Sequence, residues 1–161
     1  MLAEFFTAIS TASSMKLSRD TVHVMGKYFP KFEPLPQFSM LSSLEASFFQ
    51  SSWTLSPAFF GGCPNLQSLI LDLNDYLGSE KQLIKLLDVR QGFFSTLKFV
   101  KLTMPLADRA TPTNLALAAY FLRNCDVLEK LSVSAAFSFN ILDQIKKVPK
   151  KSLRCEIVVV D

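Results

Sequence analysis

The sequence predicts an α/β fold in which parallel strands lie on one side of the molecule and helices on the other. Three observations support this prediction: a recurring spacing of apolar residues, a helical stretch between successive occurrences, and a strand-forming C-terminus. The spacing is an apolar residue followed three and five positions later by two more. It starts at positions 12, 41, 66, 97 and 128, so successive units begin 29, 25, 31 and 31 residues apart. One strand and one helix per unit, repeated at such a period, is typical of a leucine-rich-repeat solenoid.

Each unit is expected to contain a short strand, because the second and third motif residues stand two positions apart and therefore point to one face. The motif residues are Ala12/Met15/Leu17, Leu41/Leu44/Ala46, Leu66/Leu69/Leu71, Leu97/Val100/Leu102 and Leu128/Leu131/Val133. The expected strands are 14–18, 43–48, 68–73, 99–103 and 130–134. A sixth strand is expected at 155–160, where Ile157, Val158, Val159 and Val160 are all β-branched.

Helices are expected between the strands, and several have local start or stop signals. Ser79 and Gln82 form a capping box, Thr111 and Pro112 are a cap followed by proline at the first helical position, and Pro149 ends a helix. The expected helices lie within 19–29, around 53–60, from 79 onward, from 111 onward and over 139–148. A further helix within 1–10 would be needed to cover the first strand, whereas the C-terminal region is expected to act as a cap of its own.

The composition allows a large core, since 49% of the 161 residues are hydrophobic and 19% are charged. The odd number of cysteines argues against a disulfide framework, and their spacing does not fit a metal site. Cys63 and Cys125 stand three residues before a motif leucine, where other units have Ile9, Phe38 and Phe94, so this position is expected to be an apolar slot. Reduced cysteines, without a recognisable signal peptide or membrane span, lead us to expect an intracellular protein of the nucleus or cytoplasm.

The sequence lacks residues or motifs that most classes of enzyme require. His23 is the only histidine, and the five glycines include no phosphate-binding loop, since Gly61 and Gly62 follow a helix rather than precede one. No cluster of His, Cys and carboxylate residues has the spacing of metal ligands. We therefore expect no enzymatic activity, no catalytic residue, no cofactor and no metal.

Basic residues gather near the C-terminus, at Lys146, Lys147, Lys150, Lys151 and Arg154. They could form a nucleic-acid-binding patch, although no aromatic residue is interleaved with them and a proline divides them. The alternative is that lysines at a helix end complement the helix dipole and keep that end soluble. The alternative is favoured, so neither a nucleic acid nor a membrane is an expected partner.

The strand residues between the motif positions point to the opposite side of the sheet, which we call the outward face and expect to be concave. Ile70 and Phe99 are its most informative members, because large apolar side chains there need a covering loop or a partner. We expect the outward face to bind a partner protein, chiefly through Lys16, Glu45, Ile70, Asp72, Phe99, Lys101, Lys130 and Ser132. The alternative is that these are ordinary solvated residues.

Three stretches carry a resemblance to a known family. They are 34–44 followed by Trp53, then 61–71, and finally 94–102 with 117–124 and 127–133, after which the chain ends with 148–158. Together they resemble the C-terminal part of plant F-box/FBD/leucine-rich-repeat proteins, and the last set resembles the FBD signature. The resemblance covers essentially the whole chain. It implies leucine-rich repeats over 1–90 and an FBD domain, continuous with them, over 91–161.

In that family an N-terminal F-box recruits a cullin–RING ubiquitin ligase through a Skp-type adaptor, while the repeats and the FBD select the substrate. The resemblance therefore implies the substrate-recognition part of an SCF-type E3 ubiquitin ligase, with a protein substrate as partner. No segment before Ala12 could fold as an F-box, so we expect no binding to a Skp-type adaptor and either a fragment or a truncated family member. A non-functional remnant with no retained partner is the alternative.

Overall fold

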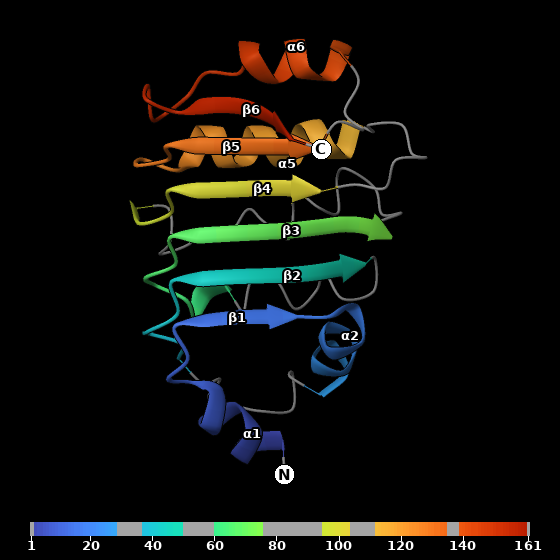
Figure 1. The fold of residues 1–161 in the computed structure, drawn as a ribbon, viewed down its shortest axis with the longest axis vertical. Helices are drawn as coiled ribbons and strands as arrows, with labels where there is room; N and C mark the ends of the chain where they lie inside the picture. The colour runs from blue at the N-terminus through green and yellow to red at the C-terminus, as the bar shows by residue number, and fades with distance from the viewer. Residues whose placement is uncertain are drawn as a thin grey trace.

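The computed structural model describes residues 2–28, 37–49, 60–75, 95–103, 112–134 and 139–160. These residues form strands and helices that are labelled in Figure 1. The strands are β1 (Ser14–Leu17), β2 (Ser43–Phe49), β3 (Ser68–Asp75), β4 (Phe99–Thr103), β5 (Lys130–Ser134) and β6 (Glu156–Val160). The helices are α1 (Leu2–Ile9), α2 (Arg19–Tyr28), α5 (Pro112–Asn124) and α6 (Phe139–Lys147).

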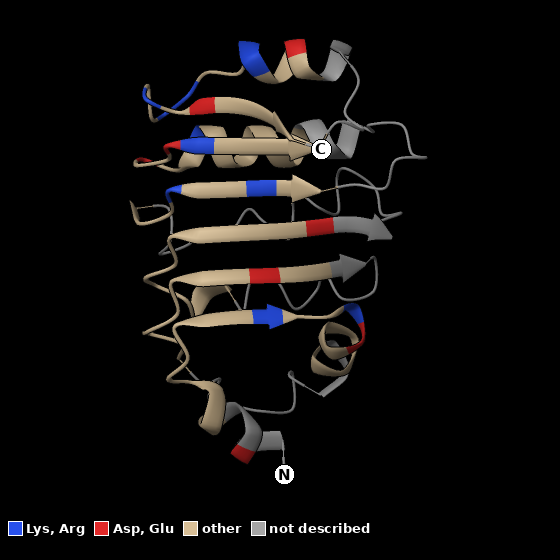
Figure 2. Ribbon diagram, in the orientation of Figure 1, with Lys and Arg blue, Asp and Glu red and all other residues tan. Residues whose placement is uncertain are grey.

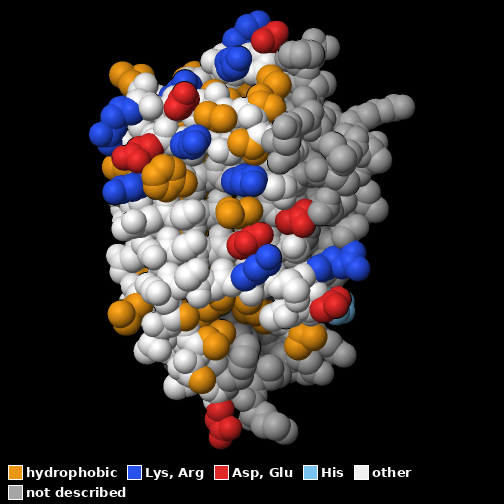
Figure 3. Space-filling view, in the orientation of Figure 1, with side chains coloured by type: hydrophobic (Ala, Val, Ile, Leu, Met, Phe, Trp, Pro, Cys, Tyr) orange, Lys and Arg blue, Asp and Glu red, His pale blue; other side chains and the backbone are white. Residues whose placement is uncertain are grey.

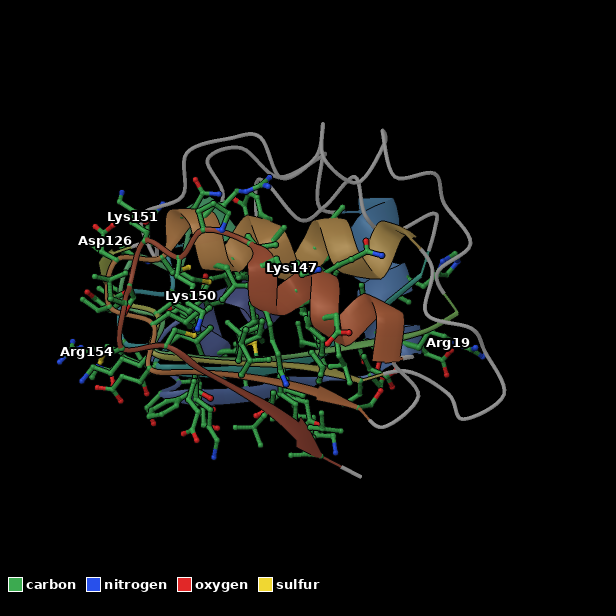
Figure 4. All side chains as sticks on the ribbon, turned by 90° about the horizontal axis from the view of Figure 1, so that it is seen from above. Arg19, Asp126, Lys147, Lys150, Lys151 and Arg154 are labelled. Carbon is green, nitrogen blue, oxygen red and sulfur yellow. The ribbon has the colours of Figure 1, made fainter. Side chains whose placement is uncertain are left out.

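The six strands form one sheet, and every neighbouring pair in it is parallel. Their order in the sheet is their order in the chain, so each unit adds one strand beside the previous one (Figure 1). The helices α2, α5 and α6 each lie in the connection between two consecutive strands, and all three lie on the same side of the sheet (Figure 4). The described residues therefore form two layers, a sheet and a layer of helices.

The strand register places the motif residues in two rows on the inward face, the side that carries the helices. The first row is Met15, Leu44, Leu69, Val100, Leu131 and Ile157, and the second is Leu17, Ala46, Leu71, Leu102, Val133 and Val159. The four leucines Leu69, Leu71, Leu102 and Leu131 are completely buried. Leu69, Val100 and Leu131 are neighbours on adjacent parallel strands, which confirms the predicted alignment of the apolar residues.

The backbone before each strand repeats one hydrogen-bonding arrangement. The carbonyl of Ser13 accepts hydrogen bonds from the amides of Ser42 and Ser43, at 2.9 and 3.2 Å. The carbonyls of Ser42, Gln67 and Lys98 each accept two hydrogen bonds from the next unit in the same way, at 2.8 to 3.1 Å. The recurring geometry continues the strand register beyond the strands and shows that these units stack equivalently.

The slot three residues before the first motif residue is apolar, as predicted. Phe38, Cys63 and Cys125 are completely buried there, and Ile9 packs against the core, whereas Phe94 lies outside the described residues. The three cysteines of the chain are free thiols. Burial raises the pKa of Cys63 to about 12 and that of Cys125 to about 12. Both thiols therefore stay protonated near neutral pH and pack as small apolar side chains.

The predicted elements agree with the structure where it describes them. The bounds of β4 and β5 are as predicted, and those of β1, β2, β3 and β6 differ by one or two residues at one end. The helices α2, α5 and α6 lie where helices were predicted at 19–29, from 111 onward and over 139–148. The predicted helix from Ser79 onward and most of the one around 53–60 lie outside the described residues.

The two ends of the sheet are covered to different extents. The N-terminal α1 forms as the repeat pattern required, and Ile9 at its end packs against the core. At the other end Val159 is 48% exposed, although it continues an inward row. β6 is an edge strand of this sheet, and no further described strand pairs with it; the role of the C-terminal region as a cap stays a prediction. None of the described helices combines the length and the apolar character needed to cross a membrane.

Candidate functional site

The outward face carries its residues in rows that run across the strands, and Figure 3 looks onto this face. One row is Lys16, Glu45, Ile70, Lys101, Ser132 and Val158, and a second is Ser14, Ser43, Ser68, Phe99, Lys130 and Glu156. In a third row Ser47, Asp72 and Thr103 are neighbours. Since alternate residues of a strand share a face, the register brings all of the predicted binding residues onto one face.

In the N-terminal half of the outward face, over β1 to β3, several polar side chains interact with each other. Lys16 Nζ lies 3.8 Å from Glu45 Oε1, and Ser47 Oγ donates a hydrogen bond to Asp72 Oδ2 at 3.3 Å. Three serines stand in register beside them, at Ser14, Ser43 and Ser68. Figure 3 shows the surface over the first residues of β2 and β3 as neither charged nor hydrophobic. This half therefore presents small hydroxyl groups and charges that already interact with each other.

The C-terminal half, over β4 to β6, has a different chemical character. Phe99 is 43% exposed, Lys101 is half-buried and Lys130 is exposed. Neither lysine forms an ion pair in the part of the chain that the structure describes. Figure 2 shows basic positions on the adjoining strands β4 and β5, one midway along its strand and one at the start. This half therefore presents lysines that have no ion pair among the described residues, beside exposed aromatic surface.

Ser132 occupies its predicted place in the row but is only 9% exposed, which differs from the solvated position that simple alternation implies. Its two neighbours in the row are Lys101 and Val158. Both have larger side chains than serine, so the short side chain between them is covered. A contact between Ser132 and a partner remains a prediction.

The structure adds residues of β6 to the outward face, among them Glu156 and Val158. The sequence analysis placed them in the last strand but assigned that strand to no face, because it contains no leucine motif. The pairing of Leu131 with Ile157 extends the inward row by one strand and turns Glu156 and Val158 outward. The same alternation, counted from Ile157 in the sequence, would have identified both residues.

The basic residues near the C-terminus are divided between the helix α6 and the turn before β6. Lys147 lies on α6, whereas Lys151 lies beside Asp126 at the end of the molecule where the strands begin (Figure 4). Lys151 Nζ is 2.7 Å from Asp126 Oδ1, and Lys150 Nζ donates a hydrogen bond to the carbonyl of Cys155 at 3.0 Å. Two of the five cations thus stabilise the turn before β6, which favours the structural interpretation of this cluster.

Over nearly its whole length the chain is similar to several proteins of Arabidopsis thaliana. It is 41% identical over 160 residues to "F-box/FBD/LRR-repeat protein At1g80470", a match that covers 99% of this chain and 34% of that protein. It is 33% identical over 165 residues to "F-box/FBD/LRR-repeat protein At1g78750", covering 99% of this chain and 35% of that protein. It is 35% identical over 164 residues to "FBD-associated F-box protein At5g22730", covering 99% of this chain and 34% of that protein.

The chain belongs to the plant F-box/FBD/LRR-repeat family. It spans about one third of the length of the family members that it matches. No family model and no solved structure matches the chain. The similarity to these proteins confirms the resemblance that the sequence motifs indicated.

In this F-box/FBD/LRR-repeat family member, few groups suited to chemistry come together in the described residues. These residues contain no group of three or more His, Cys, Asp or Glu side chains that could hold a metal ion. His23 is exposed on the helix α2 rather than placed on the sheet. The largest set of charged, polar and aromatic side chains that the described strands bring together is the outward face.

Proposed function

We propose that this chain is a protein-interaction module that recognises a partner protein through its outward face. The observation that carries the proposal is a parallel sheet whose described crossover helices, α2, α5 and α6, all lie on one side. Parallel sheets of compact α/β proteins have helices on both faces, whereas α2, α5 and α6 all lie on the inward side (Figure 4). Repeat proteins use such an extended open face for binding. The aligned leucine rows support the further proposal that the fold is a leucine-rich-repeat solenoid.

The family supports a more specific role. In F-box/FBD/LRR-repeat proteins the repeats and the FBD are the parts that the resemblance assigns to substrate selection for an SCF-type E3 ubiquitin ligase. We assign this chain the same role, with repeats over 1–90 and the FBD over 91–161. The strands β3 and β4, on either side of that boundary, pair in parallel from Ser68↔Phe99 to Asp72↔Thr103. This pairing supports a recognition surface that is continuous across the boundary, with binding rather than catalysis as its activity.

The proposal is tested by using the tagged chain as bait in a plant extract. The variant Ile70→Asp/Phe99→Asp places two carboxylates on the outward face. The control variant Val24→Asp/Leu153→Asp makes a comparable change at two other exposed apolar residues, which are 44% and 91% exposed and lie on α2 and in the turn before β6. A melting curve of each variant verifies that it is folded.

We expect the same proteins to be recovered with the unmodified chain and with the control variant, and to be lost with the outward-face variant. Charged groups introduced at the centre of an interface remove apolar contact and remain without a partner, which weakens binding strongly. Recovery of the same proteins by both variants would refute recognition through the outward face.

A further inference from the structure

Four residues of β4 and β5 form a compact block on the outward face. The register pairs Phe99 with Lys130 and Lys101 with Ser132. Neighbouring strands are about 4.8 Å apart, and alternate residues along a strand are about 6.6 Å apart. The backbones of Lys101 and Lys130 therefore stand at opposite corners of the block, roughly 8 Å apart by these spacings. The aromatic ring of Phe99 originates at a third corner, next to both lysines.

Within the described residues, the lysines of this block form no ion pair, unlike Lys16 on the same face. Lys16 interacts with Glu45, whereas Lys101 and Lys130 form no ion pair among the described residues. Glu156 follows Lys130 in the same row, but it too is without an ion pair in the described part of the chain. Lys101 is half-buried, and the attraction between a lysine and a carboxylate is stronger where protein partly excludes water than at a fully exposed position.

The block also carries an exposed apolar side chain, which is rare among the described strands. Among the described large hydrophobic residues that are exposed, Phe99 is the one on the outward face of the sheet. The others lie elsewhere: Val24 on α2, Val159 in an inward row, and Met40 and Leu153 between elements. The half-buried Ile70 is the neighbour of Lys101 on β3. Exposed aromatic residues beside apolar neighbours are frequent centres of protein interfaces.

We infer that this block is the docking site for an acidic segment of a partner protein, in which an apolar side chain packs on Phe99 and Ile70 while flanking carboxylates bind Lys101 and Lys130. The inference rests on the proposed function and specifies the chemistry of its partner. Lysine–carboxylate hydrogen bonds are charge-assisted, and they fix the position of the segment, while the apolar contact supplies the buried surface.

A protein segment fits this block better than a nucleic acid does. Nucleic-acid surfaces follow a phosphate backbone with a series of cations, whereas here only two lysines flank an apolar centre. The carboxylates of Glu45, Asp72 and Glu156 share the same outward face, so they would repel a continuous row of phosphates and confine the carboxylates of a short segment to positions beside Lys101 and Lys130. Charge complementarity therefore favours a short acidic segment that contacts β3, β4 and β5.

The inference is tested by selecting binders from a displayed library of short random peptides on the immobilised full chain. Three forms are compared: the unmodified chain, Lys101→Glu/Lys130→Glu, and the matched control Lys146→Glu/Lys147→Glu, which makes the same change at exposed positions of α6. We expect the unmodified chain and the control to enrich peptides with Asp or Glu on both sides of an aromatic or aliphatic residue. The variant Lys101→Glu/Lys130→Glu is expected to enrich Lys or Arg at those positions.

A selected acidic peptide is then titrated against each form by fluorescence polarisation. We expect its affinity to fall at least about tenfold with Lys101→Glu/Lys130→Glu, because like charges meet across the interface, and to be nearly unchanged with the control. Selected peptides without acidic residues whose binding is nevertheless lost with Phe99→Asp would overturn this inference and leave the proposed function standing. Peptide binding that is insensitive to every outward-face variant would refute both. Displacement of the peptide by a stoichiometric single-stranded oligonucleotide would overturn the inference in favour of a nucleic-acid site.

Discussion

The two faces of the sheet differ most clearly within a single strand. In β4, Val100 and Leu102 on the inward face are 2% and 0% exposed, whereas Phe99 on the outward face is 43% exposed. Lys101 stands between the two buried residues and has no ion pair among the described residues. Consecutive residues of one strand therefore have separate roles: the inward set stabilises the fold, and the outward set is available to a partner.

The two faces are expected to differ most in how much stability a substitution costs at the start of β5, where Lys130 precedes Leu131. Leu131 is completely buried, so Leu131→Ala removes apolar contacts and leaves a cavity, which lowers the free energy of unfolding by about 2–5 kcal/mol. The exposed Lys130 tolerates Lys130→Ala with a change within about 0.5 kcal/mol. Urea denaturation of both variants measures the comparison. A loss below about 1 kcal/mol for Leu131→Ala, under the usual range for such a change, would show that the inward row is misassigned.

Among single substitutions at neutral pH, removing a buried hydroxyl group is expected to cause the next largest loss of stability. Ser152 is 5% exposed, and its Oγ donates a hydrogen bond to the carbonyl of Leu128 at 2.7 Å. Ser152→Ala leaves that buried carbonyl without its donor, which is expected to cost about 1–3 kcal/mol. The same substitution at the exposed outward-face residue Ser14 is the control, and it is expected to change stability by less than about 0.5 kcal/mol. Equal losses in urea denaturation would contradict the structural role assigned to Ser152.

The buried cysteines make stability depend on alkaline pH. Burial holds the pKa of Cys63 and that of Cys125 at about 12, above the ordinary value of 9.0 for an accessible thiol. Their contribution is fully present below pH 9, because both states then keep the thiol protons. Above pH 9 the unfolded chain releases these protons and the folded chain retains them, so the free energy of unfolding falls by about 1.4 kcal/mol per pH unit and thiol up to about pH 12.

The cysteine prediction is measured by urea denaturation at several pH values from 8 upward. Lysine and tyrosine also titrate at alkaline pH, so the slope is compared with that of Cys63→Ala/Cys125→Ala. This control variant should lose stability with pH less steeply than the unmodified chain. If the two slopes coincide, the thiols are not buried in the folded chain.

The smallest expected effect concerns the ion pair on the outward face. The side chains of Lys16 and Glu45 are 78% and 44% exposed and lie 3.8 Å apart. Lys16→Ala is therefore expected to lower stability by less than about 1 kcal/mol, and the difference should vanish at high salt because exposed charges are screened. Lys101→Ala, which removes no ion pair within the described residues, should show no such salt dependence. Urea denaturation at low and high salt distinguishes the two lysines.

The inward face could be predicted from the sequence because the burial of apolar side chains alone decides which residues belong to it. Residues such as Leu69, Val100 and Leu131 must all be buried, and shifting any strand by one position would expose its whole apolar set. Only one register satisfies every unit, and the spacing of the motifs encodes that register directly. The ends of the strands were less certain, as the extension of β3 to Asp75 shows, because hydrogen bonding to neighbouring strands rather than local sequence decides where a strand ends.

The outward face could be predicted only as a set of residues, and not as a surface with a given exposure and charge. Ser132 is covered because Lys101 and Val158 stand on either side of it, and those neighbours are remote in sequence. The ion pair between Lys16 and Glu45 likewise exists only because β1 and β2 pair in one register. Side-chain exposure and pairing are thus properties of the assembled rows, which no single unit encodes.

The division between the two faces can be measured most directly by replacing each residue of β4 in turn with cysteine, from Phe99 to Thr103, and recording the rate at which a maleimide labels the folded chain. The native thiols provide a slow baseline, since all three are buried. The structure predicts rates that alternate along the strand, fast at Phe99, Lys101 and Thr103 and slow at Val100 and Leu102. Uniform rates, or faster labelling at Val100 than at Phe99, would contradict the assignment of the outward face and the recognition role built on it.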